Sequence, residues 1–352
     1  MAKTIKVSDD SFATLFLLPG GTGELTADGA VIDDTIFGQT FKSEESGILS
    51  LGISANALYK GFAGYVLDIK KQGSSTAMTA EALTLVSGKT YRIDDATKEI
   101  WNRKTALTVF DNAVNRTSEV LNVDILFGQV TFKSTYTIVG PVTVTGSYFP
   151  TLIAGKANSI TLTQTADTID TTDFPVAKAN GGYKTVDPGL RTVQIQTDHI
   201  YSLASGFLAN LTARDELILE VNPDGNAKSR ARGIFRASSH GQSGDVGQLE
   251  DETVTFNLNV PVNALGTGSI NIPIATPFAW DHAADTTLSA AILKVLSAWQ
   301  NETKLGVEYL SDGINGSRIT AVVTDVSLTS GLDAMNEFAA EFAADGAATA
   351  VP

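Results

Sequence analysis

The sequence of 352 residues contains no cysteine and only three histidines. Without cysteine, a disulfide framework, a thiolate zinc site and a cysteine nucleophile are excluded. The histidines are far apart, and none stands in a Glu-x-x-His or His-x-x-x-His pattern, so no metal site is indicated. They are His199, His240 and His282, and we expect His199 to be a surface or interface residue of a strand.

Positive charge is also scarce in this chain. Lys and Arg number 25 against 39 Asp and Glu, which gives a formal net charge of −14 and a pI of about 4.6. Because an acidic surface repels phosphates, a protein that grips nucleic acid is disfavoured. Charged residues make up only 18% of the chain and hydrophobic residues 43%, which is typical of packed globular proteins with room for two or three domains.

Long apolar runs are missing as well. The apolar patch from Phe12 to Leu18 is broken by Pro19 and has neither the length of a membrane span nor the layout of a cleaved signal. We therefore expect a soluble, unprocessed protein with no membrane partner.

Motifs that support catalysis or cofactor binding are absent. The glycines from Gly20 to Gly23 lack the Gly-Lys-Ser/Thr of a phosphate loop, and Asp224-Gly225-Asn226 lacks the distal glutamate of a calcium loop. Adjacent carboxylates such as Asp251 and Glu252 face opposite sides of a strand and cannot form an acid/base couple. The sequence therefore predicts no enzyme, no cofactor and no metal.

A repeated block is the strongest positive feature. Residues 41–59 align without a gap with residues 183–201, each block having an aromatic residue before lysine, a turn that ends in glycine, an alternating apolar strand and a final tyrosine. We expect these strands to be equivalent and to take part in assembly. The matched residues are Phe41, Gly47, Ile48, Leu51, Ile53 and Tyr59 in the first block and Tyr183, Gly189, Leu190, Val193, Ile195 and Tyr201 in the second.

A second repeat relates residues 217–230 to residues 305–318, and both copies read as strand, Asp-Gly turn, polar loop and Ser-Arg. Apolar spacing predicts one helix ahead of each copy, over 203–212 and 288–299. Short strands at regular spacing between 76 and 150 predict a separate small β module.

The two repeats together predict a domain organisation in which one β module is continuous and its partner is split. An alternative is that the C-terminal block is a partial third copy. The expected parts are an N-terminal arm or loop at 1–30, split module 1 at 31–75 plus 263–345, the small β module at 76–150, module 2 at 151–262 and a C-terminal tail at 346–352.

One basic cluster, Lys228, Arg230 and Arg232, follows Gly225 in an expected hairpin loop. A strongly acidic protein that self-assembles needs positive groups at its interfaces, so we interpret the cluster as a contact to an acidic face of the next subunit or ring. The alternative is a solvated loop tip.

These residues together resemble the tail tube (major tail) proteins of long-tailed bacteriophages. The likeness covers most of residues 30–345, and it depends on the order of its motifs. They are Thr171 to Phe174, Gly181 to Gly189, Phe37 to Phe41, Asp124 to Phe132 and Gly140 to Tyr148.

The resemblance implies a mainly β fold of duplicated sandwich- or barrel-type tube modules, each with one short helix, plus the inserted small β module, displayed outside the tube. It implies self-assembly into rings that stack into a tube, as a trimer with pseudo-sixfold symmetry or, alternatively, a hexamer. The implied setting is a virion tail, assembled in the host bacterial cytoplasm with other tail proteins, through which duplex DNA passes without specific binding. The alternative from another class is a carbohydrate- or surface-binding β module of a decoration or tail-tip protein.

Overall fold

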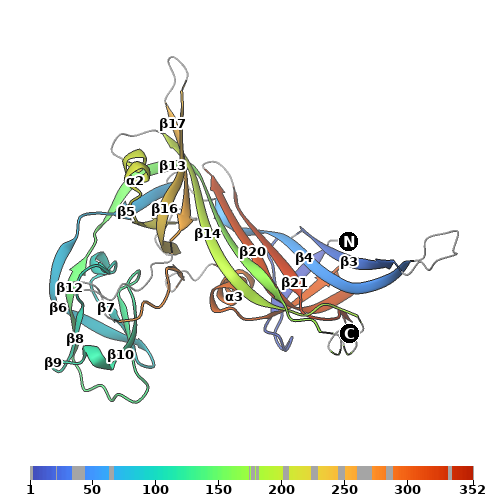
Figure 1. Ribbon diagram of the computed structural model, residues 1–352, viewed down its shortest axis with the longest axis horizontal. Helices are drawn as coiled ribbons and strands as arrows, with labels where there is room; N and C mark the ends of the chain where they lie inside the picture. The colour runs from blue at the N-terminus through green and yellow to red at the C-terminus, as the bar shows by residue number, and fades with distance from the viewer. Residues whose placement is uncertain are drawn as a thin grey trace. The chain divides into compact units, whose positions relative to one another are not determined.

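The computed structural model describes residues 3–20, 22–33, 44–62, 67–173, 175, 179, 182–200, 206–222, 229–244, 250–259, 272–282, 288–331 and 335–351. The chain forms two compact units (Figure 1). Unit 1 comprises Met1–Gly64, Ile160–Ile195 and Asp285–Pro352, and unit 2 comprises Tyr65–Ser159 and Gln196–Ala284. The mainly β prediction is confirmed.

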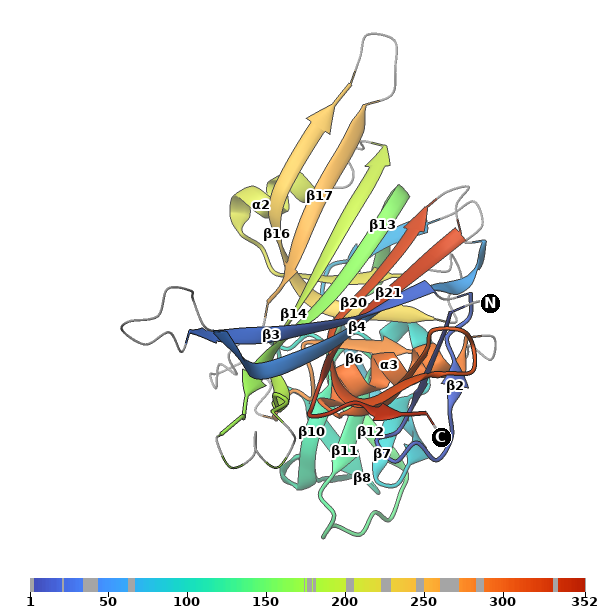
Figure 2. The same cartoon turned by 90° about the vertical axis from the view of Figure 1, so that its right-hand side faces the viewer.

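Unit 1 is a twisted antiparallel sheet covered on one face by a helix. Its strands pair in the order β3, β4, β21, β20, β19, β1 and β2, and β22 also pairs with β20 (Figure 2). Their bounds are β1 Thr4–Ser8, β2 Phe16–Leu17, β3 Thr22–Asp33, β4 Glu44–Phe62, β19 Leu305–Leu310, β20 Gly316–Gly331, β21 Met335–Ala344 and β22 Thr349–Ala350.

Helix α3 (Ala290–Asn301) covers this sheet because its apolar residues recur at helical spacing. The Ser289 side chain caps its first turn by accepting a hydrogen bond from the Ala291 amide, and Glu302 ends it in the left-handed conformation with φ of 56°. The buried residues of α3 include Ile292, Val295, Leu296 and Trp299. The predicted helix over 288–299 is therefore confirmed.

Two long strands, β13 (Thr151–Asp170) and β14 (Val186–Ile200), contribute one part to each unit. In unit 1, β13 lies against β20, where the hydroxyls of Thr161 and Thr329 are 3.5 Å apart. In unit 2, the first residues of β13 pair with β5 (Leu67–Gln72).

Unit 2 contains a second set of strands in which β5 pairs with β15, β15 with β16 and β16 with both β17 and β18. Helix α2 (Phe207–Ala213) packs on β16. It begins after Gly206, and residues 203–205 of the predicted helix lie outside the described residues. The strand bounds are β15 Leu217–Val221, β16 Arg230–Ser243, β17 Asp251–Leu258 and β18 Phe278–Asp281.

The segment between Gly73 and Pro150, called the insert below, is a seven-stranded sheet in the order β10, β11, β7, β6, β12, β8, β9. Its ends meet where the Gly73 amide donates to the Pro150 carbonyl over 2.7 Å. The elements are β6 Thr76–Ser87, β7 Thr90–Ile93, β8 Thr108–Asp111, β9 Val114–Asn115, β10 Val120–Asp124, β11 Gln129–Phe132, β12 Val142–Tyr148 and the 3₁₀ turns Ala96–Lys98 and Thr117–Glu119.

The core of the insert continues into the rest of unit 2. Its buried residues, among them Trp101, Phe127 and Phe132, form one cluster with Ile218 of β15 and Ile234 of β16. The small β module predicted at 76–150 thus exists as strands, but its packing makes it part of unit 2.

The prediction that residues 1–30 are a loop or arm is wrong for the described strands there. Residues Thr4–Ser8 pair with β19, with Ile5 and Val7 buried, and Thr22–Asp33 pair along β4. These strands were missed because five residues are too few to show a period and because two glycines interrupt the second one. The predicted module boundaries follow the sequence repeats, whereas the two units are defined by compactness. The units therefore do not test those boundaries.

The part of the chain that the structure describes has no helix with the length and apolarity needed to cross a membrane.

Candidate functional site

The sheet of unit 1 has one apolar face and one polar face, because side chains alternate along each strand. On β21, Asn336, Phe338, Ala340 and Phe342 are buried, whereas Glu337 and Glu341 are exposed. The same alternation runs through β3, β4, β20, β13 and β14. The polar face carries Glu24, Thr26 and Asp28, Ser50, Ser54 and Asn56, Asp325, Ser327 and Thr329, Glu337 and Glu341, Thr161, Thr163 and Thr165, and Thr192 and Gln194.

A hollow of about 490 Å³ lies on this face, lined by Asp28, Ser54 and Glu341 among others. The hollow also includes Lys184, whose ammonium lies 3.2 Å from the Asp170 carboxylate. Hydroxyls, carboxylates and a paired lysine therefore make this hollow polar and solvated.

Asp325 and Glu341 face each other across β20 and β21 on this surface. Burial, and secondly the neighbouring Glu341 charge, raise the pKa of Asp325 to about 6. The polar face therefore has a carboxyl that titrates near neutral pH.

The repeat residues predicted to be equivalent lie in β4 and β14, and both strands alternate as expected. Ile53, Tyr59, Val193 and Ile195 are buried, whereas Ile48 is 46% exposed and Leu190 is 81% exposed. Gly47 and Leu51 are half-buried in β4, Gly189 lies in β14 against Asp167, Tyr183 forms an isolated bridge with Leu49, and Phe41 and Tyr201 lie outside the described residues.

An ion-pair triad occurs in unit 1 at the start of the β19–β20 hairpin. The Glu308 carboxylate, 1% exposed, binds the Lys6 ammonium at 2.7 Å and the Arg318 guanidinium at 2.8 Å. Burial alone would raise the pKa of Glu308, but Lys6 and Arg318 outweigh it and lower that pKa. The Arg318 guanidinium also lies 5.4 Å from the centre of the Phe12 ring.

The same triad occurs in unit 2. The Glu220 carboxylate binds Lys70 at 2.8 Å and Arg232 at 2.6 Å, and the Arg232 guanidinium lies 4.9 Å from the centre of the Phe127 ring. Glu220 faces Arg232 across β15 and β16 as Glu308 faces Arg318 across β19 and β20. The sequence repeat aligned Arg230 with Arg318. In the structure the counterpart of Arg318 is Arg232, two residues further along the strand.

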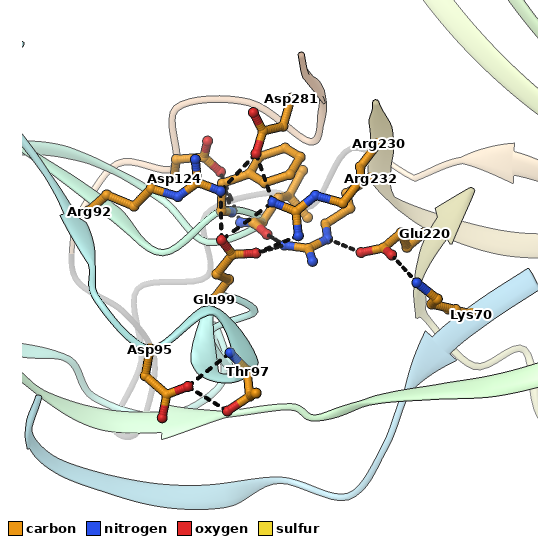
Figure 3. Close-up of polar contacts among 12 residues, drawn as sticks. Lys70, Arg92, Asp95, Thr97, Glu99, Asp124, Glu220, Arg230, Arg232 and Asp281 are labelled. Atoms are coloured by element: carbon orange, nitrogen blue, oxygen red, sulfur yellow. Dashed lines mark hydrogen bonds and ion pairs between the residues drawn. The ribbon is translucent and has the colours of Figure 1, made fainter. Parts of the chain in front are cut away.

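In unit 2 the triad continues into the insert (Figure 3). Glu99 accepts from Arg232 at 2.7 Å, from Arg230 at 2.9 Å and from Arg92 at 2.6 Å. Asp281 of β18 joins Arg92 and Arg230 at 2.8 and 2.7 Å. The network therefore links the insert to β15, β16 and β18 (Figure 3).

The surroundings hold these groups charged. Burial alone would raise the pKa of Glu220, but Arg232 and Lys70 lower it. Burial works against the charge of Arg230, yet Glu99 and Asp281 raise its pKa. Asp124 differs, because burial raises the pKa of its carboxyl even though the amides of Leu126 and Phe127 donate to it.

The prediction that Arg230 and Arg232 lie in a hairpin loop and contact another ring is wrong. Both belong to β16, Arg232 is 3% exposed, and their guanidiniums bind carboxylates of the same unit. Lys228 lies outside the described residues. The sequence placed the loop too late because the strand begins directly at Arg230.

His199 is likewise buried, with no exposed surface, and not a surface or interface residue. Its Nε2 lies 2.7 Å from one Glu252 carboxylate oxygen, and the other oxygen lies 2.6 Å from His240 Nε2. A Cβ on Gly155 would come within 2.9 Å of the His199 ring, so glycine leaves the space that this histidine fills. His282 is bonded through Nδ1 to the Ser229 hydroxyl at 2.8 Å.

Within the described ranges, no group of three or more His, Asp or Glu residues is arranged to hold a metal ion.

Among the long strands of the two described units, β3 and β16 each leave an edge without a partner. β3 is paired by β4 alone, and β16 beyond Phe235 is paired by β17 alone. By contrast, the corresponding half of β20 lies between β21 and β13. Unpaired edges of this kind are sites where another chain can add a strand.

No protein-family model matches the chain, and no curated protein matches it. Among solved structures, the chain is similar to one from the tail of an empty GTA (gene transfer agent) particle with C6 symmetry. The likeness covers 32% of this chain and 84% of that chain, with 13% identity and a TM-score of 0.28. A likeness at this TM-score establishes neither a shared fold nor a shared function.

Proposed function

We propose that this protein is a structural subunit of a phage-tail-like tube, which assembles with copies of itself into rings that stack around a channel for duplex DNA. The observation that carries the proposal is a duplicated strand set with one junction made inside the chain, at β13 and β20, and two edges left open, at β3 and β16. Such a chain has the edges needed to repeat the junction with a neighbouring copy.

The strand pairings support two equivalent modules. One reads β3, β4, β21, β20, β19, β1, and the other reads β13, β14, β17, β16, β15, β5. Both modules have the Lys–Glu–Arg triad at the same place, on the strands β1, β19 and β20 or β5, β15 and β16. We therefore extend the split-module proposal, with module 1 beginning at β1 and module 2 at β5, and the insert taking the position of the β1–β3 connection.

Ring closure follows from the open edges. If β3 of one copy lies along β16 of the next as β13 lies along β20, each chain supplies two modules to a closed barrel and three chains make a ring with pseudo-sixfold symmetry. The strands β4 and β14 then occupy matching places roughly 60° apart around the ring. Six chains are the alternative.

The polar face is the surface that suits the channel. Glu24, Asp28, Glu337 and Glu341 repel phosphates, and hydroxyl side chains offer no strong contact to DNA in passage. The opposite face is apolar and covered by α3, so it cannot line an aqueous channel.

Electron microscopy of the purified protein tests the proposal. We expect rings or hollow tubes with a channel wide enough for duplex DNA, and native mass spectrometry should give a ring mass of three chains. A protein that stays monomeric at high concentration and binds a glycan would overturn the proposal in favour of a surface-binding module.

A further inference from the structure

We infer that a second copy of this chain binds end to end through an apolar rim on the polar face of unit 1, formed by Ile48, Ile169 and Leu190. This inference rests on the proposed tube function and names the contact that stacks one ring on the next. The three side chains are 46%, 55% and 81% exposed. A partner that covers branched aliphatic side chains gains free energy, because apolar surface is removed from water.

The rim lies at one end of the strands. Ile48 and Leu190 stand near the starts of β4 and β14, and Ile169 stands near the end of β13. Backbone hydrogen bonds of 2.8 Å join Leu49 to Gly182 and Lys184, so the start of β4 and the residues just before β14 lie side by side. The side chains that follow along the same face, such as Ser50 and Thr192, are polar.

The rim is present in both repeats. Ile48 and Leu190 follow the matched glycines Gly47 and Gly189, and both remain large, aliphatic and exposed although most other positions of the repeat differ. A partner that contacts both repeats in the same way must itself have two equivalent contact surfaces. A second copy of this duplicated chain has that property.

The other end of β4 offers a receiving surface. Leu58, 39% exposed, lines a hollow of about 430 Å³ with Gly20, Asn56 and Phe338. Met335, 61% exposed, lies at the same end because it pairs with Phe62. The hollow itself is lined largely by polar side chains, so Leu58 and Met335 are the apolar surface available to the rim. An apolar projection at one end and these two exposed side chains at the other form a head-to-tail contact, which does not close on itself and builds an open stack.

The contact is tested with the double variant Ile48→Asp, Leu190→Asp. We expect it to form rings of the same mass as the natural protein by native mass spectrometry, but no tubes by electron microscopy. Met335→Asp should lose tubes in the same way, because it places a charge at the receiving end. The matched control is Leu121→Asp, a residue of the insert that is 51% exposed and should leave tubes intact.

Each result decides between the two proposals. Tubes of ordinary length from the double variant would overturn this inference and leave the tube function standing. Loss of rings as well as tubes, with an unchanged circular dichroism melting curve, would show that the rim belongs to ring closure and would also overturn it. Absence of rings and tubes in the natural protein would overturn the proposed function itself.

Discussion

Unit 1 and unit 2 contain the same Lys–Glu–Arg triad, but only in unit 2 is the arginine sealed from water. The side chain of Arg318 is 22% exposed and binds Glu308 alone among carboxylates of the described residues, whereas the side chain of Arg232 is 4% exposed and binds both Glu220 and Glu99. The difference is the insert, which supplies Glu99 and Phe127. One local pattern thus gives a triad with a partly exposed arginine in one unit and a larger, buried network in the other.

A second comparison concerns the layer beneath the helices. When unit 2 is aligned on unit 1 by counting along the strands from the two triads, His240 corresponds to Val326 and Glu252 corresponds to Phe338. The sequence repeat aligns His199 with Ala57. Unit 1 buries apolar side chains there, whereas unit 2 buries a carboxylate between two imidazoles. A buried polar cluster usually contributes less stability than the apolar packing it replaces.

Deletion of residues 76–148 should have the largest effect. The deletion removes Glu99 and uncovers Ile218, Ile234 and Arg232, so we expect unit 2 not to fold even though Gly73 and Pro150 already adjoin. Limited proteolysis and circular dichroism measure the loss. Cleavage confined to sites in 65–159 and 196–284 would show that only unit 2 has unfolded, whereas cleavage throughout the chain would show that both units have unfolded. A deletion protein that melts within a few degrees of the full chain would show that the insert is only appended.

Replacing the arginine of each triad by alanine should lower the free energy of unfolding by several kcal/mol more in unit 2 than in unit 1. Arg232→Ala leaves Glu99 and Glu220 buried with fewer partners and should destabilise the protein by about 3–5 kcal/mol. Arg318→Ala should cost only about 1 kcal/mol, because Lys6 remains on Glu308 and the Arg318 and Lys6 side chains are themselves partly exposed. Urea unfolding of both variants measures the difference, and equal losses would contradict the sealing role of the insert.

Replacing the buried His199, His240 and Glu252 by the corresponding residues of unit 1 measures what this polar cluster contributes to stability. Glu252→Ala alone removes the partner of two buried histidines and should cost roughly 2–3 kcal/mol. The triple variant His199→Ala, His240→Val, Glu252→Phe should have a free energy of unfolding no more than about 1 kcal/mol below that of the natural protein. Thermal unfolding compares the two. If the triple variant is as unstable as Glu252→Ala, packing in this layer differs between the units.

The smallest expected effect is a pH dependence in unit 1. Because the pKa of Asp325 is raised to about 6, its contribution to stability is full below its ordinary pKa and is lost as pH rises through 6. Asp325→Asn should therefore match the natural protein near pH 4 and exceed it by roughly 1 kcal/mol above pH 7, after allowance for solvent screening. Glu341→Gln should shift the titration to lower pH. Urea titrations at several pH values check both, and a pH-independent difference would contradict the assignment.

Local patterns predicted much of this fold. Alternation of apolar residues gave β4 and β14, helical spacing gave α3, and the Asp-Gly turn with its flanking strand gave β15 and β19. The mainly β class followed from these elements. The strand β1 was missed, although Ile5 and Val7 alternate, because its partner β19 lies some 300 residues later in the chain and five residues carry little pattern of their own.

The sequence by itself determined the duplication, the strands of both repeats, the acidic character and the exclusion of thiol chemistry. Only the tertiary structure decided which charges are buried, since Arg232 and Arg318 look alike in sequence but have different neighbours. It also placed His199 inside unit 2 and joined the core of the insert to Ile218 and Ile234. The physical reason is that periodicity reports which face of a strand is buried, whereas the partner on that face comes from a distant segment, which no local pattern specifies.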